Sequence, residues 1–243
     1  MSEITAQLSE KQLQFNAAME RYTTRPVYRR FGYVIAVLNV SLQAVLLVSL
    51  ISLPLDAPHF LLAFIAAYLL TDFVNGLVHM YMDNNERYTS IDGPLIANFH
   101  LHHKQPMYAR RPVAVVYFLE SGSKVWLVPT LALVAILRFT TDLDPLLIHI
   151  LVYFGILSSV AEVSHYLCHT STARLPQLLA SCGLLLSKRR HARHHLQDNC
   201  NYTFLNGWTD PLVNLIAARL CGGYKLRSDR HFAGYSGLEG DSR

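Results

Sequence analysis

Long apolar runs separated by short polar stretches dominate the chain. Residues 31–53 contain no charged side chain, and at about 1.5 Å per residue they span a hydrocarbon core of about 30 Å. Residues 59–82, 113–137 and 143–167 form three further runs of similar length. This pattern predicts an all-α integral membrane protein, a bundle of about four transmembrane helices.

Charged residues interrupt two of these runs. Asp72 lies within the second run, where an ionisable side chain is either a functional group or one that serves helix packing. In the third run, Glu120 and Lys124 are four residues apart. They either pair with each other or line a substrate pocket.

The positive charges lie on one side of this four-span scheme. The N-terminal arm, the connection 83–112 and the tail from residue 170 share a face, and they hold all but two of the 21 Lys and Arg residues. By the positive-inside rule this face is cytoplasmic, so both termini are expected in the cytoplasm. We therefore divide the chain into a cytoplasmic arm (1–30), a membrane-embedded domain (31–220) and a cytoplasmic tail (221–243).

Shorter segments are expected to form a cap of short helices on the cytoplasmic face. Residues 8–22 have the pattern of an amphipathic helix, and 188–197 is polar and helical in character. Residues 177–186 are apolar but too short to cross a membrane, which indicates an interfacial helix. Residues 211–220 resemble another amphipathic piece lying on the membrane.

Composition supports a membrane protein and narrows the chemistry. Hydrophobic residues make up 51% of the chain and charged residues 16%. The four cysteines form no CxxC pair, so the sequence indicates neither a disulfide framework nor a zinc ribbon. It also contains no Gly-rich phosphate loop and no nucleotide fingerprint, and no nucleic-acid partner is expected.

Histidine stands out, with 12 copies, most of them clustered at the cytoplasmic ends of the spans. The clustered residues are His79, His100, His102, His103, His165, His169, His191, His194 and His195. Residues three or four apart share a face of a helix, so the HxxxH and HxxHH spacings each aim two imidazoles at one point. Imidazole suits iron, zinc and copper. His59, His149 and His231 lie outside the clusters and are expected to be structural or solvated.

Three carboxylates accompany the clusters. Asp72 and Asp83 share a helical stripe with His79, and Glu162 precedes His165 by three residues. Each carboxylate could orient a histidine or bind the metal itself. We therefore take Asp83, Asp72 and Glu162 as candidate catalytic groups.

The clusters hold more ligands than one four-coordinate zinc ion can use, and two metal ions sharing them is the simplest explanation. A histidine-rich site at the mouth of a helical bundle indicates iron that oxidises a lipid chain lying between the spans. A metal transporter is the alternative from another class, but it would place its ligands near the bilayer midplane. Whether His100 is among the ligands stays open.

Several motifs resemble those of the Kua-type lipid desaturase family. They are Asp72 to His79, Phe99 to His103 with Pro106, Phe118 to Gly122, His165 to His169 followed by Leu175-Pro176, Arg190 to His195, and Gly207-Trp208. That family includes plasmanylethanolamine desaturase, which forms the plasmalogen vinyl ether, and a chloroplast desaturase. The chain departs from the family pattern at Met80, where the family has tryptophan, and near Asn199, where it has a further histidine.

The resemblance implies a di-iron desaturase that uses O2 and acts on a membrane phospholipid. Electrons would come from a carrier such as cytochrome b5 or ferredoxin. By position, the implied metal ligands are His79, His102, His103, His165, His169, His191, His194 and His195, with Asp83 as an associated acid. The expected product carries a new double bond in an alkyl or acyl chain, and the alternative is a lipid hydroxylase using the same centre.

Overall fold

The structure, a computed structural model, describes residues 3–104, 108–231 and 235, and within them it shows helices and no strand. The helices are α1 (Glu3–Thr24), α2 (Pro26–Ser49), α3 (Ala57–Asp83), α4 (Gly93–Lys104), α5 (Val113–Glu120), α6 (Leu127–Thr140), α7 (Pro145–Thr170), α8 (Arg174–Ser181), α9 (Lys188–Leu196), α10 (Asp210–Leu220) and α11 (Tyr224–Arg227). Two 3-10 turns, η1 (Leu50–Ser52) and η2 (Ser121–Ser123), extend α2 and α5. The predicted all-α class is confirmed.

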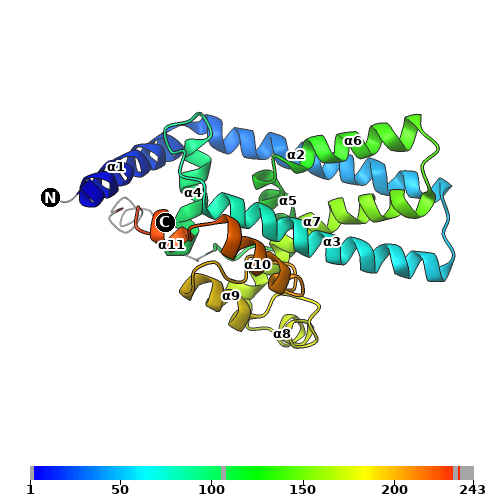
Figure 1. Cartoon of the computed structure of the whole chain (residues 1–243). Helices are drawn as coiled ribbons and strands as arrows, with labels where there is room; N and C mark the ends of the chain where they lie inside the picture. Colours follow the sequence, from blue (N-terminus) through cyan, green and yellow to red (C-terminus); the bar gives the residue numbers. More distant parts are fainter. Residues whose placement is uncertain (1–2, 105–107, 232–234, 236–243) are drawn as a thin grey trace.

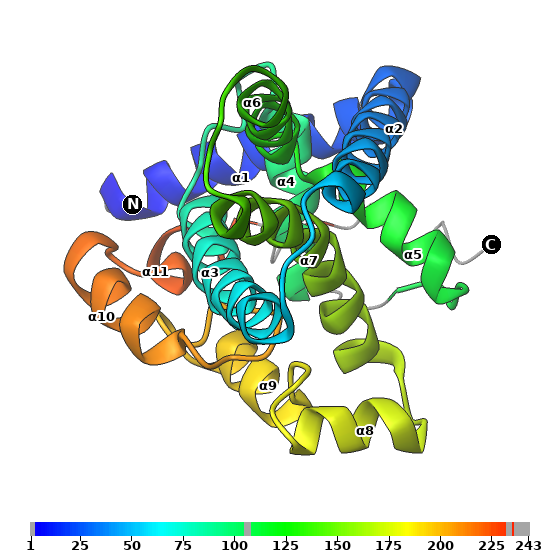
Figure 2. The same ribbon diagram turned by 90° about the vertical axis from the view of Figure 1, so that its right-hand side faces the viewer.

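Four helices, α2, α3, α6 and α7, run side by side as a bundle (Figures 1 and 2). Where α2, α6 and α7 meet, the core contains Leu46, Leu131 and Val152, all of them buried. The outward-facing side chains are apolar as well, with Val34 and Ile65 about half exposed. An apolar outer surface of this extent is suited to contact with lipid.

Three helices are long and apolar enough to cross a membrane: α2 with η1, α3, and α7. A fourth span is present if α5 with η2 and the following α6 are counted together, although the two parts meet at 94°. The helices agree with the four predicted spans when this bent pair is counted as one span, and give three otherwise. The third run, 113–137, is divided by this bend at the place where Glu120 and Lys124 interrupt its apolar pattern.

The break in the third span has a local cause. Gly122 lies against the backbone of Gly32, so closely that a Cβ at position 122 would be 2.4 Å from the Gly32 carbonyl oxygen. The Asn39 side chain donates hydrogen bonds to the carbonyls of Ser121 and Lys124, at 2.9 and 3.1 Å. Each of these carbonyls also accepts a backbone N–H, from Lys124 and from Leu127, so the Asn39 amide adds a second partner to both. The chain thus turns where helix packing and a buried amide stabilise the turn.

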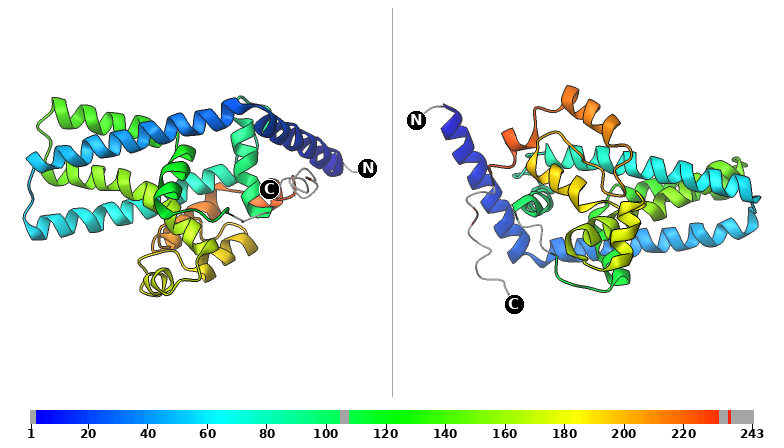
Figure 3. Two further views of the ribbon diagram at one scale, coloured as in Figure 1. Left: turned by 180° about the vertical axis from the view of Figure 1, so that it is seen from behind. Right: turned by 90° about the horizontal axis from the view of Figure 1, so that it is seen from below.

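The remaining helices gather at one end and one side of the bundle (Figures 1 and 3). Helix α1 packs on α4 and on the segment before it, where the Phe15 ring meets that of Tyr88 edge to face at 5.4 Å. The helices predicted at 8–22, 188–197 and 211–220 are confirmed as α1, α9 and α10. Helix α8 begins at Arg174, slightly before the predicted interfacial segment.

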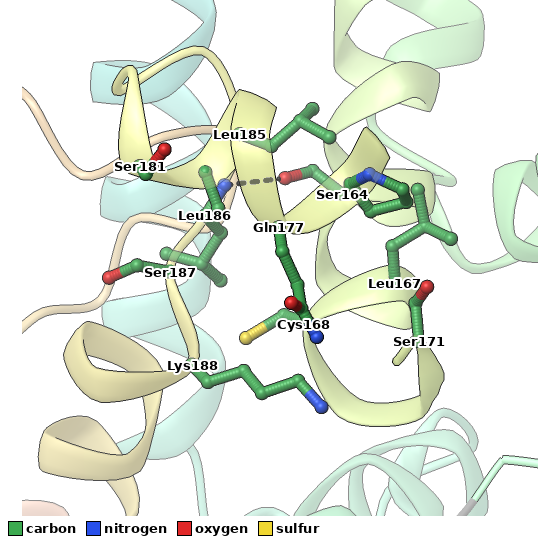
Figure 4. A pocket seen from close by; sticks show the side chains of 12 residues that line it. Ser164, Leu167, Cys168, Ser171, Gln177, Ser181, Leu185, Leu186, Ser187 and Lys188 are labelled. Carbon is green, nitrogen blue, oxygen red and sulfur yellow. Dashed lines mark hydrogen bonds between the residues drawn. The ribbon is translucent and has the colours of Figure 1, made fainter. Parts of the chain in front are cut away.

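Ser164 on α7 forms hydrogen bonds to the segments before and after α9. Its hydroxyl accepts a hydrogen bond from the backbone N–H of Leu186 at 2.9 Å, drawn in Figure 4, and donates to the Leu205 carbonyl at 2.7 Å. Leu186 precedes α9, and Leu205 lies in the segment that follows it. One buried side chain thus anchors α9 against α7 beside His165.

Candidate metal centre

Four helices, α3, α4, α7 and α9, bring the clustered histidines together. They converge at the end of the bundle opposite the short α2–α3 and α6–α7 connections (Figure 1). Within the described residues, two groups of side chains have the spacing of metal ligands. Each group combines residues from at least three helices, so the site depends on the folded bundle.

The first group consists of His102, His165, His169 and His191, whose ligand atoms all lie within 4.8 Å of one another. The Nε2 atom of His102 is 3.1 Å from the Nε2 atoms of His165 and His169. The Nε2 atom of His191 is 2.9 and 2.7 Å from the same two atoms. The Nε2 atom of His195 lies 2.9 Å from that of His191, so His195 borders this group.

The spacing of these nitrogens fits a bound cation. A neutral imidazole has one N–H and one lone pair, so several ring nitrogens that meet at one point cannot all be paired by hydrogen bonds. Two ligands about 2.1 Å from one metal ion and at right angles to each other are about 3 Å apart. The Nε2 atoms of the group are 2.7 to 3.2 Å apart in the contacts they form. The donor type and the spacing therefore both fit a first-row transition metal.

The second group consists of His79, Asp83, His103 and His194. The Asp83 Oδ1 atom is 2.9 Å from Nε2 of His103, and Oδ2 is 3.6 and 3.5 Å from Nε2 of His79 and of His194. Asp83 Oδ2 and His194 Nε2 are buried and lack a hydrogen-bond partner within the described chain. An unsatisfied buried atom costs about 1–3 kcal/mol, and a metal ion between these two would satisfy both. Asp83 thus lies among the candidate ligands themselves.

Backbone carbonyls orient two ligands of the second group. The Nδ1–H of His79 donates to the Tyr202 carbonyl at 2.7 Å, and the Nδ1–H of His194 donates to the Cys200 carbonyl at 2.9 Å. Each bond leaves the Nε2 lone pair free for a metal. Between these carbonyls, Asn201 has a φ of 56°, in the left-handed region that asparagine tolerates better than most residues.

Burial keeps most of the ligand histidines outside the spans uncharged. It lowers the pKa of His191 and His194 well below the usual value, and neighbouring histidines lower it further. It lowers the pKa of His195 to about 3. For His103, burial again acts to lower the pKa, but the Asp83 carboxylate outweighs it and raises the value. A neutral imidazole offers the lone pair that a metal ion binds.

The two groups lie side by side. His102 and His103 are consecutive at the end of α4 and belong to different groups. His191 and His194 on α9 are also divided between the groups, with ring centroids 5.6 Å apart. The His195 ring lies between them, 4.6 Å from the His191 ring and 5.0 Å from the His103 ring. All eight histidines that the sequence predicts as ligands thus lie in or next to a pair of adjacent sites.

Asp72, a predicted catalytic candidate, belongs to neither group. Its Oδ1 accepts hydrogen bonds from the backbone N–H groups of Asn206 and Gly207, at 3.0 and 3.2 Å. Its Oδ2 accepts from the backbone N–H and the hydroxyl of Thr209, at 2.9 and 2.7 Å. Asp72 therefore anchors the segment between α9 and α10 to α3.

Glu162 lies beside the first group. Its Oε1 forms an ion pair with Lys124 at 2.9 Å, and its Oε2 is 3.9 Å from Nδ1 of His165. Lys124 also donates to Oδ1 of Asn75 at 2.6 Å. Lys124 therefore pairs with Glu162 on another helix. Among the described residues it forms no ion pair with Glu120, so the local pairing of these two residues is not observed.

His100 is buried but uses its ring elsewhere. Its Nε2–H donates to the Met82 carbonyl at 2.8 Å, and its Nδ1 is 2.7 Å from the Tyr88 hydroxyl. Both nitrogens are occupied, so His100 is a structural residue. The other histidines outside the predicted ligand set also bond outside both groups: His59, His149 and His231.

A cavity of about 570 Å³ borders both groups. His79, His102 and His165 line it, together with Glu120 and Glu162, and further lining residues come from α1, α2 and α4. A second cavity, of about 290 Å³, lies between α7, α8 and the start of α9 (Figure 4). None of the candidate metal ligands lines the second cavity. The larger one is therefore the candidate substrate cavity.

Sequence reasoning missed the residues that hold the ligands in place. The Tyr108 hydroxyl lies 3.2 Å from Nδ1 of His165, and the Tyr224 hydroxyl donates to the backbone carbonyl of His194. Each tyrosine is far in sequence from the histidine that it contacts, and no spacing rule connects the two. The resemblance-based motifs also stop before Tyr224.

Comparison with known proteins gives one family. A family model described as a lipid desaturase domain matches residues 68–218, a range that includes every candidate ligand. The chain is similar to fatty acid desaturase 4, chloroplastic, of Arabidopsis thaliana, with 30% identity over 163 residues, 62% of this chain and 47% of that protein. It thus spans about half the length of this curated relative. No solved structure gives a significant match.

Proposed function

The chain belongs to the lipid desaturase family, and on this premise we propose that it introduces a carbon–carbon double bond into a chain of a membrane phospholipid, with O2 as oxidant. One observation supports this most: two adjacent groups of imidazole ligands border a cavity large enough for part of a lipid. Imidazole-rich sets of this kind suit iron. We therefore propose two iron ions as the cofactor.

The two groups divide the ligands between the irons. His102, His165, His169 and His191 would hold one ion, and His79, Asp83, His103 and His194 the other. Bound there, the ions would supply the activation of O2 and the removal of two hydrogens from adjacent carbons. Two electrons and two protons complete the balance, so that O2 leaves as two water molecules. We propose a small carrier such as cytochrome b5 or ferredoxin as the electron donor.

The protein's own residues would orient the reacting groups. The carbonyls of Cys200 and Tyr202 fix the rings of His194 and His79, and the Lys124–Glu162 pair lies against His165. Such supporting contacts typically change metal affinity or activity by about 10- to 100-fold when removed. They keep the ligands rigid while a flexible lipid enters.

More finely, we propose an ether phospholipid as substrate and its vinyl ether as product, as in plasmanylethanolamine desaturases. A vinyl ether double bond lies next to the glycerol oxygen, so the polar head must approach the metal ligands. Glu120 and Tyr108 supply polar wall beside His102 and His165 in the same cavity. A bond formed far along the chain would need an apolar wall at this place.

The metal and the reaction are tested together on purified protein. After expression with iron, wild type should carry close to two irons per chain and form the alkene in an O2-dependent reaction. His165→Ala and His194→Ala should abolish product formation and lower the iron content, because each removes a ligand from one group. His149→Ala is the matched control, since within the described residues the His149 ring bonds to its own helix, at the Pro145 carbonyl, and lies in neither ligand group.

Three outcomes would contradict the proposal. Stoichiometric zinc with no iron and no turnover would exclude an oxidative centre. An oxygenated lipid without alkene would assign a hydroxylase. Full activity in His194→Ala would remove the second group from the site.

A further inference from the structure

Glu120 is a carboxylate in the cavity wall that has no partner. It is half-buried at the end of α5, and in the described part of the chain it forms no hydrogen bond and no ion pair within 4 Å. Lys124, one turn further on, is occupied by Glu162 and Asn75. A shielded carboxylate without a partner is unfavourable, which indicates that a ligand supplies one.

The part of the cavity wall that α2 forms carries a single cation. Among the cavity-lining residues, Arg29 in the first turns of α2 is the only Lys or Arg. Arg29 is exposed and forms no hydrogen bond or ion pair with the described residues. The guanidinium group binds phosphate well, because its donors match the phosphate oxygens. The cavity thus presents one unpaired positive and one unpaired negative group.

Tyrosine rings line the same cavity as these two charged groups. Tyr22, Tyr28, Tyr33 and Tyr108 all line the cavity. Burial raises the pKa of Tyr22, the Glu120 charge raises it further, and Arg29 acts to lower it, so both charges are close to this ring. Tyrosine faces attract organic cations. An ammonium group near Glu120 would therefore have both a carboxylate and aromatic faces as partners.

We propose that this cavity binds a zwitterionic phospholipid head group, with Glu120 binding its ammonium group and Arg29 its phosphate. That the ligand is a phospholipid follows from the proposed function, on which this assignment rests. The cavity should prefer a zwitterionic head group to one with phosphate alone, because the latter would leave Glu120 unpaired. The rival explanation is that Glu120 only balances Arg111, whose charge also acts on it. Arg111 is exposed and lies outside the cavity wall.

Equilibrium binding to the purified protein tests this without turnover. The probes are a 1-O-alkyl phosphatidylethanolamine and the phosphatidylglycerol with identical chains. Wild type should bind the ethanolamine lipid more tightly by about ten- to a hundredfold, the range of a hydrogen bond to a charged group. Glu120→Gln should remove this preference and leave binding of the glycerol lipid unchanged. Arg29→Gln should weaken both lipids, and Glu20→Gln, an exposed change on α1, should affect neither.

Equal binding of the two lipids by wild type would overturn the proposal, and so would an equal loss for both lipids in Glu120→Gln. The second result would assign Glu120 to balancing Arg111. If Glu120→Gln does not fold, the wild-type preference and the Arg29→Gln variant still decide. A preference for the ethanolamine lipid with no desaturation of either lipid would refute the proposed function and leave the head-group site standing.

Discussion

Two buried aspartates on α3 have different roles. Asp83 has a carboxylate oxygen with no partner beside three imidazoles, whereas both oxygens of Asp72 accept hydrogen bonds from the segment 206–209. The same substitution should therefore affect mainly the stability at Asp72 and mainly the metal content at Asp83. An amide keeps one acceptor oxygen but replaces the other by a donor, which suits neither a metal ion nor a ring of N–H donors.

Asp72→Asn should lower the stability by about 3–6 kcal/mol, because hydrogen bonds to charged groups contribute about 1.5–3 kcal/mol each and two of them are replaced by opposed donors. Iron per folded chain should stay near the wild-type value. Asp83→Asn should lose one of the two proposed irons with a smaller change in stability. Metal analysis and thermal unfolding of both variants in detergent check this. Loss of iron in Asp72→Asn at unchanged stability would return Asp72 to the metal site.

At the scale of elements, the sequence predicts which helices carry ligands but not how they share them. The HxxxH spacing on α7 does bring His165 and His169 together, with Nε2 atoms 3.2 Å apart. On α9, His191 and His195 meet in the same way, but His194 belongs to the other group. Residues three apart differ by about 60° around a helix. Which of them shares a site then depends on how α9 is rotated against α3.

Other differences also arise from contacts between distant segments. The bend before α6 depends on Gly32 and Asn39, which lie far from it in the sequence. The role of Asp72 depends on a loop more than a hundred residues away. Periodicity and spacing describe one helix at a time. They therefore predict spans and ligand types but not the contacts between residues far apart in the sequence.

A buried cluster joins α4 to the residues after α11 and should make the protein sensitive to acid. The Tyr88 hydroxyl is 2.7 Å from Nδ1 of His100 and 3.1 Å from Nδ1 of His231. Burial lowers the pKa of both histidines to about 4. Their usual value is about 6.5, so between these pH values the unfolded chain binds protons that the folded chain does not. Their contribution to stability is complete above about pH 6.5 and is lost progressively as the pH falls toward 4.

The apparent melting temperature in detergent should therefore fall between pH 7.5 and pH 5. In His231→Gln, which removes one titrating group of the cluster, the fall should be smaller by about 2–4 °C, the shift that about 1 kcal/mol produces in a chain of this size. The metal-ligand histidines are present in both proteins. A difference between the two pH series is therefore due to the cluster and not to those ligands. An identical pH dependence in the two proteins would show that His231 is not part of the effect.

At the scale of the whole molecule, the site requires that all segments carrying its ligands lie on the same side of the membrane. The Ser228 hydroxyl donates to the Asp83 carbonyl, and the Tyr224 hydroxyl donates to the His194 carbonyl. The residues after α10 therefore contact the end of α3 and the helix that carries three histidines. All of these segments must lie on one side of the membrane. The distribution of Lys and Arg predicts that this side is the cytoplasm.

Reporter fusions test the topology directly. Fusions after Arg30, between residues 84 and 111, and after Arg227 should all report the cytoplasm, and a fusion within residues 55–57 should report the opposite side. The α2–α3 connection lies at the far end of the bundle from α4 and α11 (Figure 1), which is why the two sets should differ. Replacing Arg29 and Arg30 by glutamine should weaken the orientation signal without changing the helices. A tail found opposite to the 84–111 connection would separate His194 from Asp83 and His103, and no arrangement of two metal ions could then use all the histidines.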